Sequence, residues 1–76
     1  MIYIQHVDRG SMDVDEVIDI VETPEEAADS FEEYMTYPED YDYNREALIE
    51  VLSTDEEAQV LPANDRGTYY ILFAHA

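Results

Sequence analysis

Residues 23–37, TPEEAADSFEEYMTY, decide the fold because they carry the clearest helix signal in the chain. Thr23 is a favourable N-cap, Pro24 suits the first helical position, and Glu26 stands where it can close a capping box. One apolar stripe recurs at helical spacing: Ala27, Ala28, Phe31, Tyr34 and Met35. The pattern therefore predicts one main helix from Thr23 to about Tyr37.

The segment before this helix indicates a hairpin of two strands. Residues 2–7 have the β-branched and aromatic alternation of a first strand, and residues 8–11, DRGS, have turn chemistry. Residues 13–22, DVDEVIDIVE, fit helical spacing as well as a strand. Their five β-branched residues favour a strand over Val17–Glu22. Alternation in that strand places two pairs on opposite faces: Val17 with Val21, and Ile18 with Ile20.

The stretch after the loop at residues 37–44 can be interpreted in two ways. Residues 44–52, NREALIEVL, alternate as in a strand. Asn44 can equally cap a possible second short helix near residues 45–53, with Leu48, Val51 and Leu52 on one face. Propensity and pattern leave both alternatives open.

The last third of the chain predicts a terminal hairpin. Residues 59–61 and 68–74 flank a turn signal, NDRG, at residues 64–67. Residues 69–74, YYILFA, have the apolar density of a central, buried strand. Together the elements define an α+β fold: a small antiparallel sheet of three or four strands packed against one main helix, in a single domain over residues 1–76.

The charge of the chain is its most unusual feature. Twenty Asp and Glu residues face three Arg and no Lys, which gives a formal net charge of −17. Like-charge neighbours on the predicted helix, such as Asp29 with Glu25 and Glu33, each cost about 0.2–0.5 kcal/mol, and no Lys is present to recover that cost. Because such repulsion destabilises a compact state, the charge either has a use or answers an unusual solvent.

A row of carboxylates on a rigid helix can approximate a row of phosphates. Side chains four residues apart rise about 6 Å along a helix. Duplex DNA carries one charge per roughly 1.7 Å of its axis, both strands counted. A protein that binds nucleic acid through Lys and Arg can therefore be occupied by such a surface.

The loop at residues 37–44, YPEDYDYN, adds aromatic rings to the acids. Tyr supplies a large contact area at small entropic cost, and its ring accepts Arg stacking. The expected partner-binding residues come from the helix and the loop: Glu25, Asp29, Glu32, Glu33, Tyr37, Glu39, Asp40, Tyr41, Asp42 and Tyr43. Four earlier acids extend this surface if they lie on the same side: Asp13, Asp15, Glu16 and Asp19. The other aromatic residues fall into two groups. The core or the sheet faces are expected to hold Tyr3, Tyr34, Tyr69 and Tyr70, and the core is expected to hold Phe31 and Phe73.

In size, charge and absence of Lys, the whole chain resembles the small acidic proteins that phages use as DNA mimics against host defences, such as anti-CRISPR and anti-restriction inhibitors. These inhibitors share no common fold, so the resemblance implies a class of function and assigns no residue roles. It implies a non-enzymatic inhibitor that occupies the basic nucleic-acid-binding surface of a partner, such as a CRISPR or restriction effector, in the cytoplasm of a host cell.

Two other interpretations stay open. Proteins of halophilic organisms are acidic and poor in Lys because high salt screens the repulsion. Against this, apolar and aromatic residues are plentiful here, and Arg is not raised in place of Lys. An acidic antitoxin, or another regulator of a basic partner, would also carry an anionic surface. The sequence does not indicate the oligomeric state.

Enzymatic activity, cofactors and metals are not expected. No carboxylate pair is marked out for acid–base catalysis, Cys is absent, and the two Gly residues form no phosphate loop, so no catalytic residue and no cofactor is predicted. His6 and His75 lie on the two terminal strands and could meet if these are neighbours, but a metal site would need further ligands. The absence of a basic patch and of a long apolar run argues against binding nucleic acid directly or spanning a membrane, and a cytoplasmic protein is expected.

Overall fold

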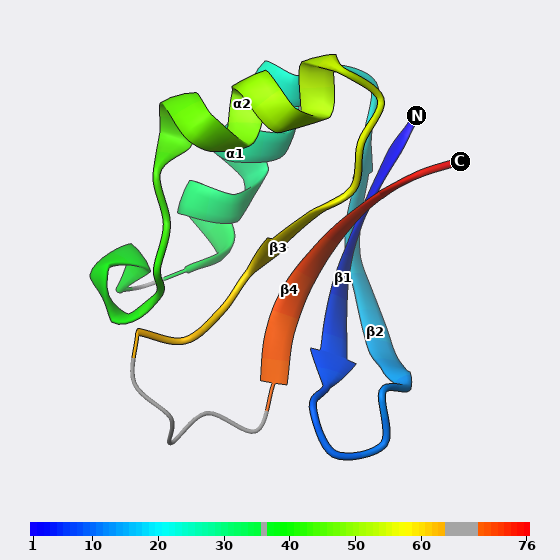
Figure 1. Cartoon of the computed structure of the whole chain (residues 1–76), viewed down its shortest axis with the longest axis vertical. Helices are drawn as coiled ribbons and strands as arrows, with labels where there is room; N and C mark the ends of the chain where they lie inside the picture. Colours follow the sequence, from blue (N-terminus) through cyan, green and yellow to red (C-terminus); the bar gives the residue numbers. More distant parts are fainter. Residues whose placement is uncertain (36, 64–68) are drawn as a thin grey trace.

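The computed structural model describes residues 1–35, 37–63 and 69–76. Its elements are β1 (Ile2–Asp8), β2 (Val14–Val21), α1 (Pro24–Tyr34), the short 3-10 helix η1 (Pro38–Asp40), α2 (Arg45–Ser53), β3 (Ala58–Val60) and β4 (Tyr69–His75). The strands form one antiparallel sheet in the order β2-β1-β4-β3, and both helices cover the same face of it (Figure 1). We call that face the helical side and the opposite face the open side. The predicted α+β class is confirmed, but a single main helix is only partly right, because α2 packs beside α1.

The first hairpin forms as predicted, and its second strand begins earlier than expected, at Val14. Asp8 closes the turn: its Oδ1 accepts hydrogen bonds from the N–H groups of Gly10 (2.7 Å) and Ser11 (3.3 Å). An Asp side chain that bonds the backbone two residues on is a common turn device. The turn signal in the sequence therefore acts through Asp8.

Two β-bulges interrupt the β1–β2 register and change which side chains share a face. Val21 lies opposite Ile2 on the helical side, whereas Val17 lies opposite Gln5 on the open side. The prediction that Val17 shares a face with Val21 is therefore wrong, and so is the pairing of Ile18 with Ile20. The extra residue, Ile18, reverses the alternation of the strand. Ile18 itself packs against the core.

Helix α1 begins as predicted and ends early. The Glu26 N–H donates to Thr23 Oγ1 (3.2 Å), and the Thr23 hydroxyl donates to Glu26 Oε1 (3.1 Å). The helix ends at Tyr34 instead of about Tyr37. Met35 turns to an extended conformation (φ −87°, ψ 118°) and packs against the core, which stops the helix there.

The ambiguous stretch after the loop is a helix, which confirms the possible second helix near residues 45–53. Asn44 Oδ1 accepts a hydrogen bond from the Ala47 N–H (2.9 Å), and this cap selects the helical alternative over the strand. Leu48 and Leu52, one turn apart, are both buried in the core.

The terminal hairpin pairs β3 with β4, as predicted. Ala58 lies opposite Phe73, and Val60 lies opposite Ile71. The predicted turn at residues 64–67 lies outside the described residues. Because β4 lies between β1 and β3, the YYILFA segment is a central strand.

The core lies between the helices and the helical side of the sheet. Phe31 of α1 is fully buried, and its ring centroid lies 4.5 Å from that of Tyr43 and 5.9 Å from those of Tyr41 and Phe73. The buried cluster draws on every strand and both helices: Ile2, Ile4, Val21, Ala27, Ala28, Phe31, Leu48, Leu52, Val60, Ile71 and Phe73. The core assignment of Phe31 and Phe73 is confirmed.

Candidate binding surface on the helical side

The strand register sorts the side chains of the sheet between its two sides, because residues directly opposite each other share a side. The open side collects ten paired positions: Tyr3, Gln5, Val7, Val14, Val17, Ile20, Gln59, Tyr70, Leu72 and Ala74. None of these ten carries a charge. Glu16 and Asp19 of β2 pair instead with positions of β1 that face the helices. The sheet therefore directs these acids to the helical side.

The carboxylates of β2 are joined to α1. The Ser30 hydroxyl donates to Asp19 Oδ2 (2.6 Å), and the Tyr34 hydroxyl donates to Glu16 Oε1 (3.3 Å). The Ser30 bond, with the backbone N–H of Ile20, lowers the pKa of Asp19. Burial and the nearby Glu16 raise the pKa of Tyr34. Two of the four earlier acids, Glu16 and Asp19, lie on the same side as the acids of α1. They therefore extend the acidic surface, as expected for acids on that side.

The other two acids of that extension lie toward the hairpin turn. Asp13 and Asp15 are exposed. Asp15 Oδ2 lies 3.8 Å from His6 Nδ1. Tyr34 was assigned to the core or a sheet face, but 43% of it is exposed, so it belongs to the surface.

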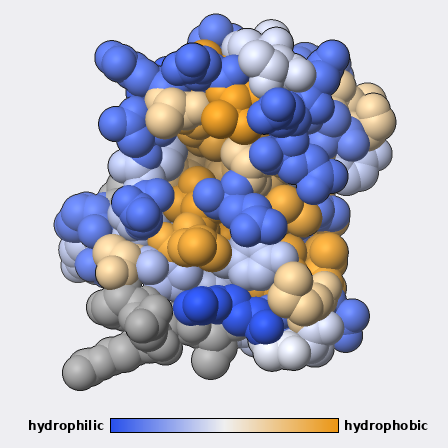
Figure 2. Space-filling view, viewed as in Figure 1, coloured by the Kyte–Doolittle hydropathy of each residue, from blue (hydrophilic) through white to orange (hydrophobic). Residues whose placement is uncertain are grey.

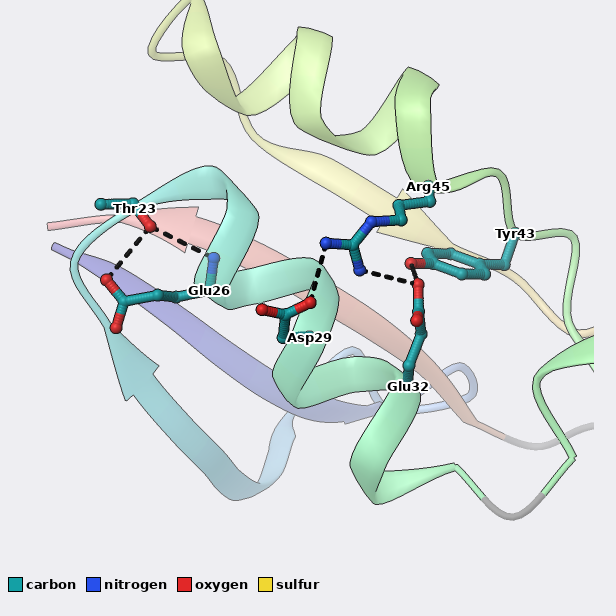
Figure 3. A network of polar contacts seen from close by, with 6 residues as sticks. All are labelled: Thr23, Glu26, Asp29, Glu32, Tyr43 and Arg45. Atoms are coloured by element: carbon teal, nitrogen blue, oxygen red, sulfur yellow. Dashed lines mark hydrogen bonds and ion pairs between the residues drawn. The ribbon is translucent and has the colours of Figure 1, made fainter.

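Arg45 joins α2 to the acids of α1 (Figure 3). Its Nη2 lies 2.7 Å from Asp29 Oδ1, and its Nη1 donates to Glu32 Oε2 (3.0 Å). The Tyr43 hydroxyl donates to the same Glu32 oxygen (2.6 Å). The Tyr43 bond and then Arg45 lower the pKa of Glu32, while burial and the Glu32 contact raise the pKa of Tyr43.

This contact corrects the expectation that the repulsion along the helix goes uncompensated. Arg45 compensates Glu32 and Asp29 together, and the hydrogen bonds that it donates to both carboxylates raise its own pKa. The sequence gives no sign of the pairing, because Arg45 lies 13 and 16 residues away from its partners, outside any helical spacing. The two carboxylates are held in place and form a group of net charge −1 with Arg45.

The remaining acids of the predicted contact set stay at the surface. Glu25 and Glu33 of α1 are exposed, as are the three acids of the loop, Glu39, Asp40 and Asp42. The loop backbone is anchored to the segment that follows β3: the Asp42 N–H donates to the Leu61 carbonyl (2.8 Å), and the Ala63 N–H donates to the Asp40 carbonyl (2.9 Å). The loop carboxylates therefore project from a fixed backbone.

The three Tyr residues of the loop divide into two kinds. Tyr37 is 62% exposed and lies at the surface. Tyr41 and Tyr43 are half-buried, and their rings pack on Phe31. Tyr37 can stack on a partner side chain with its full face, whereas the other two hold the loop against the core.

An open groove of about 560 Å³ runs between α2 and β3. Figure 2 shows hydrophobic residues gathered in the middle of this face, with hydrophilic residues around them. The groove has an apolar wall and three carboxylates among its lining residues: Leu48, Val51 and Val60, with Asp42, Glu56 and Glu57. Such a lining suits a long basic side chain, whose methylene stem packs while its charge meets a carboxylate. Glu56 and Glu57 were missed, because their sequence resembles an ordinary polar connection.

The two His residues do not meet. β1 and β4 are neighbours, which is the condition for the two imidazoles to meet, but the antiparallel register places His75 opposite Ile2 and His6 opposite Ile71. The imidazoles therefore lie toward opposite ends of the strand pair. In the part of the chain that the structure describes, no group of three or more His, Asp or Glu side chains is arranged to hold a metal ion.

Within those same ranges, α1 and α2 are too short and too polar to cross a membrane. Comparison with protein-family models, with curated proteins and with solved structures gave no match. The surface itself is therefore the guide to function.

Proposed function

We propose that this protein is a non-enzymatic DNA mimic that inhibits a basic nucleic-acid-binding protein, such as a CRISPR or restriction effector, by occupying its nucleic-acid site. One observation carries the proposal: the paired acids of the sheet face the helices, while the ten paired positions of the open side carry no charge. A surface that is acidic on one side only can dock in a cationic groove in a defined orientation.

The acids are held by the fold before any partner arrives. Asp19 accepts from Ser30, Glu32 accepts from Tyr43 and Arg45, and the loop backbone is bonded to the segment after β3. Groups that are already ordered lose less conformational freedom on binding, so more of the electrostatic attraction appears as affinity.

The partner's basic side chains would meet three neighbouring parts of the surface. On α1 they would meet the exposed carboxylates of Glu25 and Glu33, and beyond the C-terminal end of α1 they would meet the acids of the loop. Tyr37 offers an exposed ring on which an Arg guanidinium can stack. The groove beside α2 takes the stem of a further Lys or Arg.

Retention from a bacterial lysate, with and without competing duplex DNA, tests the proposal. Retained proteins should be nucleic-acid binders, and DNA should displace them. The double variant E33Q/D40N should retain less of the same partner, because it removes two exposed carboxylates of the surface. The matched control E46Q/E50Q removes the same charge from α2, outside the predicted set, and should retain more. Partners that do not bind nucleic acid, or that DNA fails to displace, would contradict the proposal.

Circular dichroism in dilute buffer distinguishes mimicry from adaptation to high salt. We expect the chain to be folded in dilute buffer, because its one-sided core does not depend on screening. A chain that folds only in molar salt would instead support the halophilic interpretation.

A further inference from the structure

The open side of the sheet has no helix over it, yet it is apolar. Val14 and Val17 are each 48% exposed and Ile20 is 50% exposed, and all three lie on the edge strand β2. Leu72 and Ala74 of β4 are half-buried on the same side. Apart from the amides of Gln5 and Gln59 and the hydroxyls of Tyr3 and Tyr70, the paired positions of this side carry hydrocarbon.

This surface departs from the usual pattern of an antiparallel sheet. When one face of such a sheet packs on the core, the other normally carries polar residues that meet water. Twenty of the 76 residues are acidic, so an even distribution would place acids among the ten paired positions. The YYILFA segment of β4 also has the composition of a strand that is covered on both faces.

We propose that the open side is a dimer interface, and that its occupant is the open side of a second copy of this chain. Two antiparallel sheets commonly pack face to face, about 10 Å apart, with their apolar side chains interdigitated. A two-fold axis would place the same patch on both partners. Each copy then covers what remains exposed on the other's open side, where Val7 (2% exposed) and Tyr70 (6% exposed) are already buried.

The distribution of charge selects a second copy over a basic partner. A basic protein is attracted to the acidic helical side and finds no carboxylate among the paired positions of the open side. Two copies that meet through any acidic surface repel each other. Open side against open side puts both helical sides outward, separated by two sheets, which exceeds the screening distance of about 8 Å at physiological salt.

The interface is small, so the dimer dissociates on dilution. Four strands about 4.8 Å apart, three of them seven or eight residues long and β3 only three, give the open side an area of roughly 400 Å², which is below the roughly 800 Å² per partner of a standard interface. The inference does not rest on the proposed inhibitor function, because it concerns the opposite side of the sheet.

Sedimentation equilibrium over a range of protein concentrations tests the interface. The mass should rise with concentration to twice the chain mass of 8.8 kDa. Val17→Asp adds a carboxylate to the patch and should raise the dimer dissociation constant by roughly tenfold or more. Ala47→Asp adds a carboxylate at an exposed position of α2 and should leave the dissociation constant unchanged. Val17→Thr keeps a β-branched side chain and should also raise the dimer dissociation constant. It provides the test if Val17→Asp fails to fold.

Three results would overturn the inference: a monomer at every concentration, a dimer that both Val17 variants leave intact, or a dimer that dissociates as salt is raised. The last would show an electrostatic contact, because added salt should leave an apolar interface intact or strengthen it. If the chain forms the dimer but retains no nucleic-acid-binding partner, the inhibitor function alone is contradicted. If it retains such a partner but stays a monomer, the dimer alone is contradicted.

Discussion

The helical side and the open side of the sheet are built from the same four strands but present opposite surfaces. On the helical side, aromatic and aliphatic residues are buried beneath a layer whose carboxylates are bonded in place, as at Asp19 and Glu32. On the open side, aliphatic residues such as Val17 and Ile20 are half exposed, with no acid at the paired positions. This difference shows that strand pairing directs Glu16 and Asp19 of β2 to the helical side and leaves the paired positions of the open side uncharged.

The largest expected difference between the two sides is in stability. Phe31→Ala should lower the free energy of unfolding by about 3–5 kcal/mol, because it removes a fully buried ring from the only core formed by the described residues. Val17→Ala should cost less than about 1 kcal/mol in dilute protein, because this side chain is half exposed. Urea unfolding measures both. Equal losses would remove the distinction between a packed side and an uncovered side.

The second largest difference between the two sides should be in how binding at each side depends on salt. Raising salt from low to moderate concentration should weaken the complex with a basic partner by roughly tenfold or more, because the attraction between charged surfaces is screened. Self-association through the open side should not weaken. Titration calorimetry on the complex and sedimentation on the free chain provide the two measurements. A partner affinity that is flat with salt would point to a mainly apolar contact.

A smaller effect is expected at the start of α1, on the helical side alone. Thr23→Ala removes the oxygen that caps the Glu26 N–H and should cost about 1 kcal/mol of unfolding free energy. Thr54→Ala at the end of α2 removes a hydroxyl that donates to the Val51 carbonyl and should cost less, because that carbonyl also accepts the Thr54 N–H. Thermal unfolding of the two variants provides the comparison. A change in the dimer dissociation constant on Thr23→Ala would mean that the two sides are coupled.

The smallest effect should depend on pH. Tyr43 and Arg45 lower the pKa of Glu32 below its ordinary value of 4.5, so the ionised carboxylate stabilises the folded chain. That contribution is complete above about pH 4.5 and is lost as the pH falls through the lower folded-state pKa. The stability difference between the wild-type chain and Glu32→Gln should therefore shrink in acid. It should be modest at neutral pH, because solvent screens an exposed pair.

Tyr43→Phe provides the matched background for this measurement. It keeps the ring on Phe31 and removes the hydroxyl that donates to Glu32. In that background, Glu32→Gln should cost less than in the wild-type chain at neutral pH. A cost that is the same in both backgrounds would show that the hydroxyl does not stabilise the carboxylate.

Elements that depend on neighbouring residues were predictable from the sequence. The Thr23 cap, the Asp8 turn and the apolar stripe of α1 all act within about four residues, and each has a composition signal. The sequence of residues 44–52 contains the N-cap of α2, Asn44, but its apolar alternation fits a strand equally well. The sequence alone therefore does not decide between the two.

Features that depend on distant residues were not predictable. The bulge at Ile18 exists because β2 must pair with β1 while keeping Val21 in the core, and nothing local marks it. The early end of α1 follows from the place of Met35 against the core. The predicted partner-binding residues follow from the local density of acids in the sequence. The positions of Arg45, Glu56 and Glu57 depend instead on how α2 lies beside α1 and β3.

The two bulges of β2 also bear on how large an assembly this chain can form. An edge strand with regular, unpaired backbone groups is a template onto which further chains add, and the product is a fibre. Extra residues at two points twist and unpair the β2 edge. At the other edge β3 is only three residues long, and residues 40–42 bond to the chain just beyond it. With both edges closed to growth, a chain with such an apolar sheet can stop at a discrete particle instead of polymerising.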